Sequence, residues 1–163
     1  MQPSRPDLIL ILQTLSQHDV EFIVVGGVCG ALHGSSDVTF DLDLVHSRNP
    51  ENVARLLKAL RKLDARYRDP AGRVIRPTEA HLASPGHQLL MTKGGPLDLL
   101  GEIGKHRDYE ALLPDTVTFV VSKDLRVRAL TLAALIKTKE EAGREKDKAG
   151  LAVLQQMLKN KRK

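Results

Sequence analysis

The sequence contains very few aromatic residues: it has no tryptophan, and its two tyrosines and three phenylalanines make up 3% of the 163 residues. Aromatic rings are the usual platforms on which unpaired bases stack, so their scarcity argues against sequence-specific reading of single-stranded nucleic acid. Hydrophobic residues still make up 42% of the chain, which is enough for a folded core. We expect that core to consist mainly of Leu, Val, Ile and Ala.

Cysteine and long apolar runs are also scarce. Cys29 is the single cysteine, so no internal disulfide can form, and we expect a reducing, cytoplasmic location. The small residues around Cys29 favour a packed thiol over a nucleophile. No run approaches the roughly 18 to 20 apolar residues of a membrane helix. The short apolar run 8–12 lacks the basic start and cleavage site of a signal peptide, so we expect no membrane association.

Positive charge exceeds negative charge, since 25 Lys and Arg stand against 20 Asp and Glu for a net charge of +5. This balance fits a polyanionic partner or a triphosphate substrate, or it serves solubility alone. Part of the excess lies in residues 159–163, a basic tail that we expect to be disordered. A second basic group consists of Arg61, Lys62, Arg66, Arg68, Arg73 and Arg76. It either holds the phosphates of a tRNA acceptor or forms a solvated helix end and loop.

Hydrophobic periodicity and capping residues divide the chain into short elements. The predicted helices are 4–17 with Ser4 as N-cap, 27–33, one beginning at Pro50 behind an Asn49 cap, 108–113, 131–141 and 146–158. The predicted strands are 21–25, 39–46, 87–92, 96–102, 116–121 and 125–129, and residues 66–86 are expected to be mostly loop. This order predicts an α/β fold of the α+β type. A mixed β-sheet flanked by helices spans 1–130, and a C-terminal helical pair over 131–158 packs on that core.

The most informative stretch is 22–45, where an apolar run ends in Gly26-Gly27 and Asp41-Leu42-Asp43 follows. Residues i and i+2 of a strand share a face, so Asp41 and Asp43 are expected to project the same way, roughly 6–7 Å apart. Carboxylates placed so closely repel unless a cation lies between them, and Mg²⁺ or Mn²⁺ prefers such oxygen ligands together with phosphate oxygens. The glycine pair removes Cβ where a strand turns into a helix, so that backbone N–H groups can approach a phosphate.

Asp98 is a lone acid in the apolar strand pattern of residues 95–100. If that strand neighbours the one carrying Asp41 and Asp43, three carboxylates converge. Two can then hold metal, while the third can also accept a proton from an attacking hydroxyl. The alternative readings are a hairpin carboxylate for Asp98, and a charged outer face of an edge strand for the other two. His33 and His46 match no zinc-ligand spacing, and His33 is expected to hydrogen-bond at the turn.

These motifs resemble those of the polymerase-β-like nucleotidyltransferase superfamily, and above all its small bacterial abortive-infection and toxin–antitoxin branch. The residues that carry the resemblance are GGVCGALHG at 26–34, DVTFDLD at 37–43, the late Asp98, and LIKTKEEAGREKD at 135–147. The similarity covers most of residues 20–155. It implies a nucleotidyltransferase fold and transfer of a nucleoside monophosphate from an NTP to a hydroxyl on a tRNA or a protein, with release of pyrophosphate.

The resemblance also implies roles for individual residues. Asp41, Asp43 and Asp98 would hold Mg²⁺ or Mn²⁺, and Asp98 would also serve as general base. The nucleotide-binding residues would be Gly26 and Gly27 through their backbone N–H groups, Thr39 through its hydroxyl, and Lys139 and Arg144 as triphosphate contacts; the alternative for the last two is a solvated helix face.

One position departs from the family pattern, because Asp37 stands where an arginine is common. An acid there reverses a charge beside the triphosphate site and weakens nucleotide binding. It motivates the alternative function, a non-catalytic module that kept the fold and acts as an antitoxin-like partner or a nucleic-acid adaptor.

Overall fold

The computed structural model describes residues 6–36 and 41–161. Seven strands form one mixed sheet in the order β3-β4-β5-β2-β1-β7-β6. The strands are β1 (Phe22–Val25), β2 (Leu42–His46), β3 (Arg66–Tyr67), β4 (His87–Thr92), β5 (Gly95–Leu100), β6 (Thr116–Ser122) and β7 (Leu125–Leu130). β2 runs parallel to β5, and β1 runs parallel to β7, while the other neighbours are antiparallel. The predicted mixed α/β architecture is therefore confirmed.

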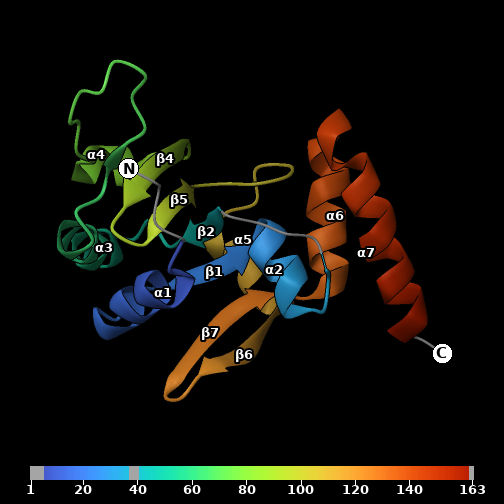
Figure 1. Ribbon diagram of the computed structural model, residues 1–163. Coiled ribbons are helices and arrows are strands. Elements are labelled where there is room, and N and C mark those ends of the chain that lie inside the picture. The colour runs from blue at the N-terminus through green and yellow to red at the C-terminus, as the bar shows by residue number, and fades with distance from the viewer. Residues whose placement is uncertain (1–5, 37–40, 162–163) are drawn as a thin grey trace.

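Helices pack around the sheet (Figure 1). They are α1 (Leu8–Gln17), α2 (Gly26–Leu32), α3 (Pro50–Lys62), α4 (Glu79–Ala83), α5 (Tyr109–Leu112), α6 (Leu132–Ala142) and α7 (Lys148–Lys161). In Figure 1, α3 and α4 lie at the β3–β4 end, whereas α6 and α7 stand on the opposite side. None of the helices in the described ranges is long and apolar enough to cross a membrane.

Capping residues set several helix ends, among them the predicted Asn49 cap. The Asn49 side chain accepts a hydrogen bond from the Glu51 N–H at 3.0 Å ahead of α3, and Thr131 caps α6 in the same way. Gly143 ends α6 with a left-handed φ of 63°, which glycine adopts at little cost. One cap was predicted wrongly: α1 is capped by Asp7, whose Oδ1 accepts from the Leu10 N–H at 3.0 Å.

The segment 66–86 is mostly loop, as predicted, and it also contains the short strand β3 and the helix α4, which begins in a capping box formed by Thr78 and His81. One further expectation is corrected. The C-terminal helix α7 continues to Lys161, beyond the predicted end at Leu158. Residues 159–161 of the expected disordered tail are thus helical, and 162–163 lie outside the described residues.

The core is aliphatic, as the composition predicted. Its largest fully buried side chains come from the sheet and from α1, α3 and α4: Ile11, Leu15, Ile23, Leu42, Leu44, Leu56, Leu60, Leu63, Leu82, Leu90, Leu97 and Leu99. The C-terminal helices join this core, because Leu135 of α6 and Leu154 of α7 are buried. α2 lies against both helices, because a Cβ built on Gly30 would be in ordinary van der Waals contact with Leu154, at 3.6 Å, and Leu135, at 4.0 Å.

Candidate functional site

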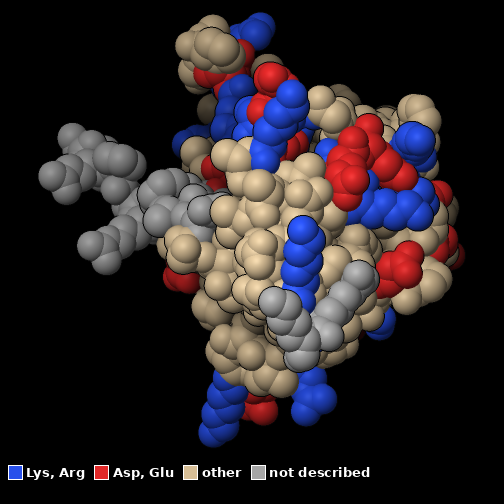
Figure 2. Space-filling view, turned by 90° about the vertical axis from the view of Figure 1, so that its right-hand side faces the viewer, with Lys and Arg blue, Asp and Glu red and all other residues tan. Residues whose placement is uncertain are grey.

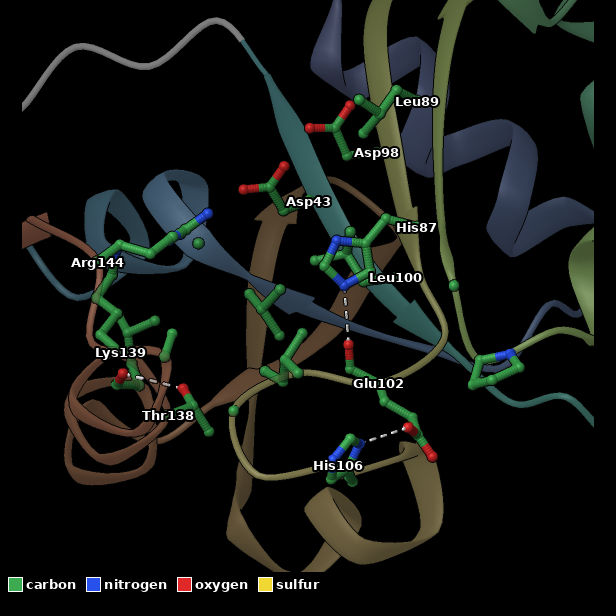
Figure 3. Close-up of a pocket in the computed structure, with 18 of the residues that line it drawn as sticks. Asp43, His87, Leu89, Asp98, Leu100, Glu102, His106, Thr138, Lys139 and Arg144 are labelled. Atoms are coloured by element: carbon green, nitrogen blue, oxygen red, sulfur yellow. Dashed lines mark hydrogen bonds and ion pairs between the residues drawn. The ribbon is translucent and has the colours of Figure 1, made fainter. Parts of the chain in front are cut away.

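Asp43 and Asp98 lie side by side on the two central strands β2 and β5. The strands are parallel, and the two residues are direct partners in the register. Since alternate residues of a strand share a face, the fully buried Leu42 and Leu44 beside Asp43 direct its carboxylate away from the core. Both acids line one cavity of about 830 Å³, and the sheet thus brings these two predicted residues together (Figure 3).

The environment of Asp43 disfavours its charged form. Burial is the largest cause, followed by the negative charge of Asp98, a hydrogen bond with Asp98 and the charge of Asp41, and together they raise the pKa of Asp43 to about 7. Lys139 opposes this shift. Two neighbouring carboxylates that cannot both ionise easily share a proton. A divalent cation between them would remove the same repulsion.

Gly26 stands where β1 passes into α2, directly against Asp43. Its φ is 66°, and a Cβ on it would lie 2.2 Å from Oδ2 of Asp43. No side chain fits there, so the glycine is required by both the backbone conformation and the carboxylate. Gly27 is exposed and is not part of the cavity lining.

The cations of the cavity come from the end of α6 and the turn after it. Lys139, Arg144 and Lys146 line the wall opposite the strands, and Figure 3 shows Arg144 extending toward the side where Asp43 lies. Asp147 pairs with two of them: its carboxylate lies 2.8 Å from Arg144 Nε and 3.8 Å from Lys139 Nζ. The two predicted triphosphate contacts therefore face the predicted carboxylates across one cavity.

The loop 101–107 forms a further wall and is fastened to α6. Arg107 donates two hydrogen bonds to Glu141, from Nε to Oε1 at 2.8 Å and from Nη2 to Oε2 at 2.6 Å. The Lys105 N–H also donates to Glu141 Oε1, and the hydrogen bond from Arg107 is the main reason that the pKa of Glu141 falls to about 2. Gly104 has a φ of 58°, and a Cβ there would lie 2.5 Å from Glu141 Oε1. These contacts fix the loop against the helix that carries Lys139.

Two histidines that the sequence did not single out face the cavity. His87 Nε2 lies 3.0 Å from the Glu102 carbonyl oxygen, and His106 Nδ1 lies 3.3 Å from Glu102 Oε1 (Figure 3). Leu89 and Leu100 complete this wall, which combines imidazole and apolar groups.

Arg68 is a third residue whose position sequence reasoning missed. Its Nη2 lies 2.6 Å from Oδ1 of Asp98, so the expected member of a basic RNA-binding stretch contacts a site carboxylate instead. Arg73 and Arg76 of the same stretch also pair with nearby acids, Asp69 and Asp64. A second hollow of about 540 Å³ lies beside Arg66, Arg68 and Arg73.

The remaining predicted residues are placed as follows. Asp41 is exposed and precedes β2, which begins at Leu42, so the shared strand face expected for Asp41 and Asp43 does not form within the described strand. Thr39 and Asp37 lie outside the described residues. Over 6–36 and 41–161, no group of three or more His, Cys, Asp or Glu is arranged to hold a metal ion. The three-carboxylate ligand set therefore stays a prediction.

Cys29, His33 and His46 each lie within hydrogen-bond distance of a backbone carbonyl oxygen. The Cys29 thiol is buried and donates to the Leu130 carbonyl, and burial raises its pKa to about 12, so it is a packed thiol as predicted. His33 Nε2 also lies 2.8 Å from the Leu130 oxygen, so its ring bonds the distant strand β7 and not the turn that follows it. His46 is buried, with Nε2 2.8 Å from the Leu82 oxygen.

Charge on the outer face formed by α6 and α7 is scattered. Figure 2 views the molecule from that side, and its Lys and Arg side chains are interspersed with Asp and Glu around a broad uncharged area. This face shows no continuous basic patch. The positive charge that the cavity offers to a ligand is therefore that of the cations lining it, and not that of this outer face.

Comparisons with known proteins agree with this geometry at the level of the fold. No protein-family model matches the sequence, and no curated protein matches it. Among solved structures, a protein from Thermotoga maritima described as a “putative nucleotidyltransferase” superimposes with a TM-score of 0.56. The two are 17% identical, and the match covers 89% of this chain and 88% of that chain. The chain thus has a nucleotidyltransferase-like fold.

Proposed function

We propose that the protein is a metal-dependent nucleotidyltransferase that transfers a nucleoside monophosphate from an NTP to a hydroxyl of a macromolecule, either tRNA or a partner protein. The observation that carries this proposal is the pairing of Asp43 with Asp98 across one cavity from Lys139 and Arg144. Acids on one side suit a hydrated divalent cation, and cations on the other suit a polyphosphate chain.

The residues present fit Mg²⁺ or Mn²⁺. Asp43 and Asp98 offer hard carboxylate oxygens on adjacent strands, and burial together with the negative charges of Asp98 and Asp41 raises the pKa of Asp43. Mg²⁺ in such sites commonly takes one or two carboxylates and completes its shell with water and phosphate oxygens. Asp41, whose charge already acts on Asp43, is the proposed third ligand. When bound, the ion would neutralise charge on the phosphates during transfer.

The chain's own residues would supply binding and positioning. Lys139 and Arg144 hold the β- and γ-phosphates, which leave together as pyrophosphate once the acceptor oxygen has bonded to the α-phosphorus. Asp98 accepts the proton of the attacking hydroxyl. Gly26 leaves room for the substrate beside Asp43, because it places no side chain there. Such transfer depends mainly on alignment and charge stabilisation, which this arrangement provides.

A second candidate is a non-catalytic binding module, and the Arg68–Asp98 ion pair favours it. A guanidinium on a site carboxylate satisfies that acid without a metal. A protein that had lost catalysis while keeping the fold would then bind a partner protein or RNA through its basic surface, in a salt-sensitive manner.

Thermal unfolding with each of the four NTPs, with and without Mg²⁺, separates the two candidates. A ligand that binds only the folded state raises its stability, so an enzyme shows a Mg²⁺-dependent rise in Tm for at least one NTP. Asp43→Ala abolishes that rise, whereas the control Asp69→Ala, whose carboxylate pairs with Arg73 outside the cavity, keeps it.

An NTP that produces the rise is then supplied in labelled form with total tRNA and with total protein to identify the acceptor. If no NTP shifts the wild-type Tm, the binding module becomes the better description. A rise that persists in Asp43→Ala would place the nucleotide elsewhere.

A further inference from the structure

One carboxylate, that of Asp147, joins the two main cations of the cavity. Its Oδ2 lies 2.8 Å from Arg144 Nε, and its Oδ1 lies 3.8 Å from Lys139 Nζ. Lys139 belongs to α6, whereas Arg144 and Asp147 lie beyond the turn at Gly143. The acid therefore connects cations on the two sides of that turn.

The contrast with Glu145 shows that this placement is specific. Both acids lie in the same single turn of 3₁₀-helix. The Asp147 side chain is 13% exposed and is turned toward the cavity cations, whereas the Glu145 side chain is 81% exposed and pairs with Lys148 at the surface. These two acids, two residues apart, thus pair with cations in different places: Asp147 with those of the cavity and Glu145 with one at the surface. Glu145 therefore offers a matched control.

We infer that Asp147 is a positioning residue, which holds Lys139 and Arg144 ready to grip a condensed phosphate chain. This inference rests on the proposed function, since it concerns the same cavity. Lys and Arg lose much rotamer freedom when they bind a ligand, and side chains already held by an ion pair have less left to lose. Asp147 also offsets the mutual repulsion of Lys139, Arg144 and Lys146 while the cavity holds no phosphate.

The geometry leaves the cations available to a ligand. Asp147 engages Arg144 through Nε, at the side of the guanidinium, and in Figure 3 the Arg144 side chain extends toward Asp43. The 3.8 Å separation at Lys139 is long for a charged hydrogen bond. Asp147 therefore attracts the ammonium group but leaves its N–H donors available to a ligand. A chain of phosphates can therefore contact both cations while Asp147 keeps them apart at a set spacing.

Inorganic tripolyphosphate without metal is the probe, because it reports on the cations alone. We expect calorimetric titration to show binding by the wild type, and an increase in Kd of about tenfold in Asp147→Asn, equivalent to about 1.4 kcal/mol. Asp147→Glu keeps the charge and recovers a large part of the affinity. Glu145→Gln stays within about twofold of the wild type, since its partner Lys148 lies outside the cavity lining. The Tm of each variant without ligand separates loss of fold from loss of affinity.

Three results would overturn the inference. The first is a wild type that does not bind tripolyphosphate. The second is an Asp147→Asn variant that binds it as well as the wild type does. The third is an Asp147→Asn variant that binds it more tightly, which would make Asp147 a competitor of the ligand. The proposed function fails separately: if no Mg·NTP stabilises the protein but tripolyphosphate binding still depends on Asp147, the cation cluster is real and the transferase assignment is wrong.

Discussion

The strand wall and the helix wall of the cavity are built in different ways. Asp43 and Asp98 are fixed by the backbone register of β2 and β5, two strands that each have neighbours on both sides. Lys139 and Arg144 are held by side-chain ion pairs around the turn at Gly143. A substitution at the strand wall therefore disturbs backbone hydrogen bonds between rigid strands. The effect of a substitution at the helix wall is smaller and depends on salt concentration, because ion pairs hold that wall.

The largest effect in this comparison is expected from Gly26→Ala. The new Cβ would lie 2.2 Å from Asp43 Oδ2, and the residue would also have to keep a φ of 66°. Either β1 or the carboxylate must move, so we expect loss of Mg·NTP binding. We also expect the free energy of unfolding to fall by well over ~1 kcal/mol, since a left-handed backbone alone costs about 1 kcal/mol. Urea denaturation and ligand-induced Tm shifts measure the two effects.

Gly143→Ala is the matched change on the helix wall. Its φ is 63°, nearly that of Gly26, but the nearest atom to the new Cβ is the Glu140 carbonyl oxygen at 3.9 Å. It should show the backbone cost with nucleotide binding retained. Equal losses in the two variants would mean that left-handed backbone, and not contact with Asp43, explains the role of Gly26.

The pKa values of one acid on each wall are shifted in opposite directions. The pKa of Asp43 is raised from 3.8 to about 7, so its contribution to stability is complete below about pH 4 and is lost as the pH rises to about 7. The pKa of Glu141 is lowered from 4.5 to about 2, so its contribution is present above about pH 4.5 and is lost as the pH falls toward 2. We expect Asp43→Asn to remove the decline between pH 4 and 7, and Glu141→Gln to flatten the acid side of the profile.

Urea denaturation across pH 2.5–8 in the presence of a chelator measures these profiles, because a bound cation would mask the titration of Asp43. A profile for Asp43→Asn that still declines between pH 4 and 7 as steeply as the wild type would place the titrating group elsewhere. The two substitutions act on opposite limbs, so each serves as the control for the other.

Local signals explain why much of the fold could be predicted from the sequence. Asn49 and Thr131 cap helices, and Gly143 ends one, through hydrogen bonds and backbone angles set within a few residues. The β4–β5 hairpin around Lys93 and Gly94 is equally local. The strand pairing of Asp43 with Asp98 was reached differently, through the resemblance and the lone acid in an apolar strand.

Long-range contacts explain what could not be predicted. Arg68 reaches Asp98 because β3, β4 and β5 are neighbours in the sheet, and neither the two-residue β3 nor this order has a clear signal in the sequence. The contact of Arg107 with Glu141 joins the loop 101–107 to α6 over 34 residues of sequence, and no local pattern indicates it. The cap residue Asp7 also donates its backbone N–H to the Gly94 carbonyl of a distant hairpin, a contact without a local signal, and Ser4 lies outside the described residues.

The smallest effect is expected from Arg68→Gln, which tests whether Arg68 blocks access of a cation to Asp98 on the strand wall. At the proposed metal site, a divalent cation would compete with the Arg68 guanidinium for the same Asp98 oxygen. Removal of the guanidinium should therefore tighten Mn²⁺ binding a few-fold while lowering the free energy of unfolding by at most about 1 kcal/mol. The free Mn²⁺ signal in electron paramagnetic resonance measures the affinity, with Arg73→Gln as the control, because Arg73 pairs with Asp69 away from the cavity.

Weaker Mn²⁺ binding in Arg68→Gln would show instead that Arg68 orients Asp98 for the metal. The strand wall would then depend on a side-chain ion pair, as the helix wall does, and the contrast between the two would be smaller than the backbone register suggests.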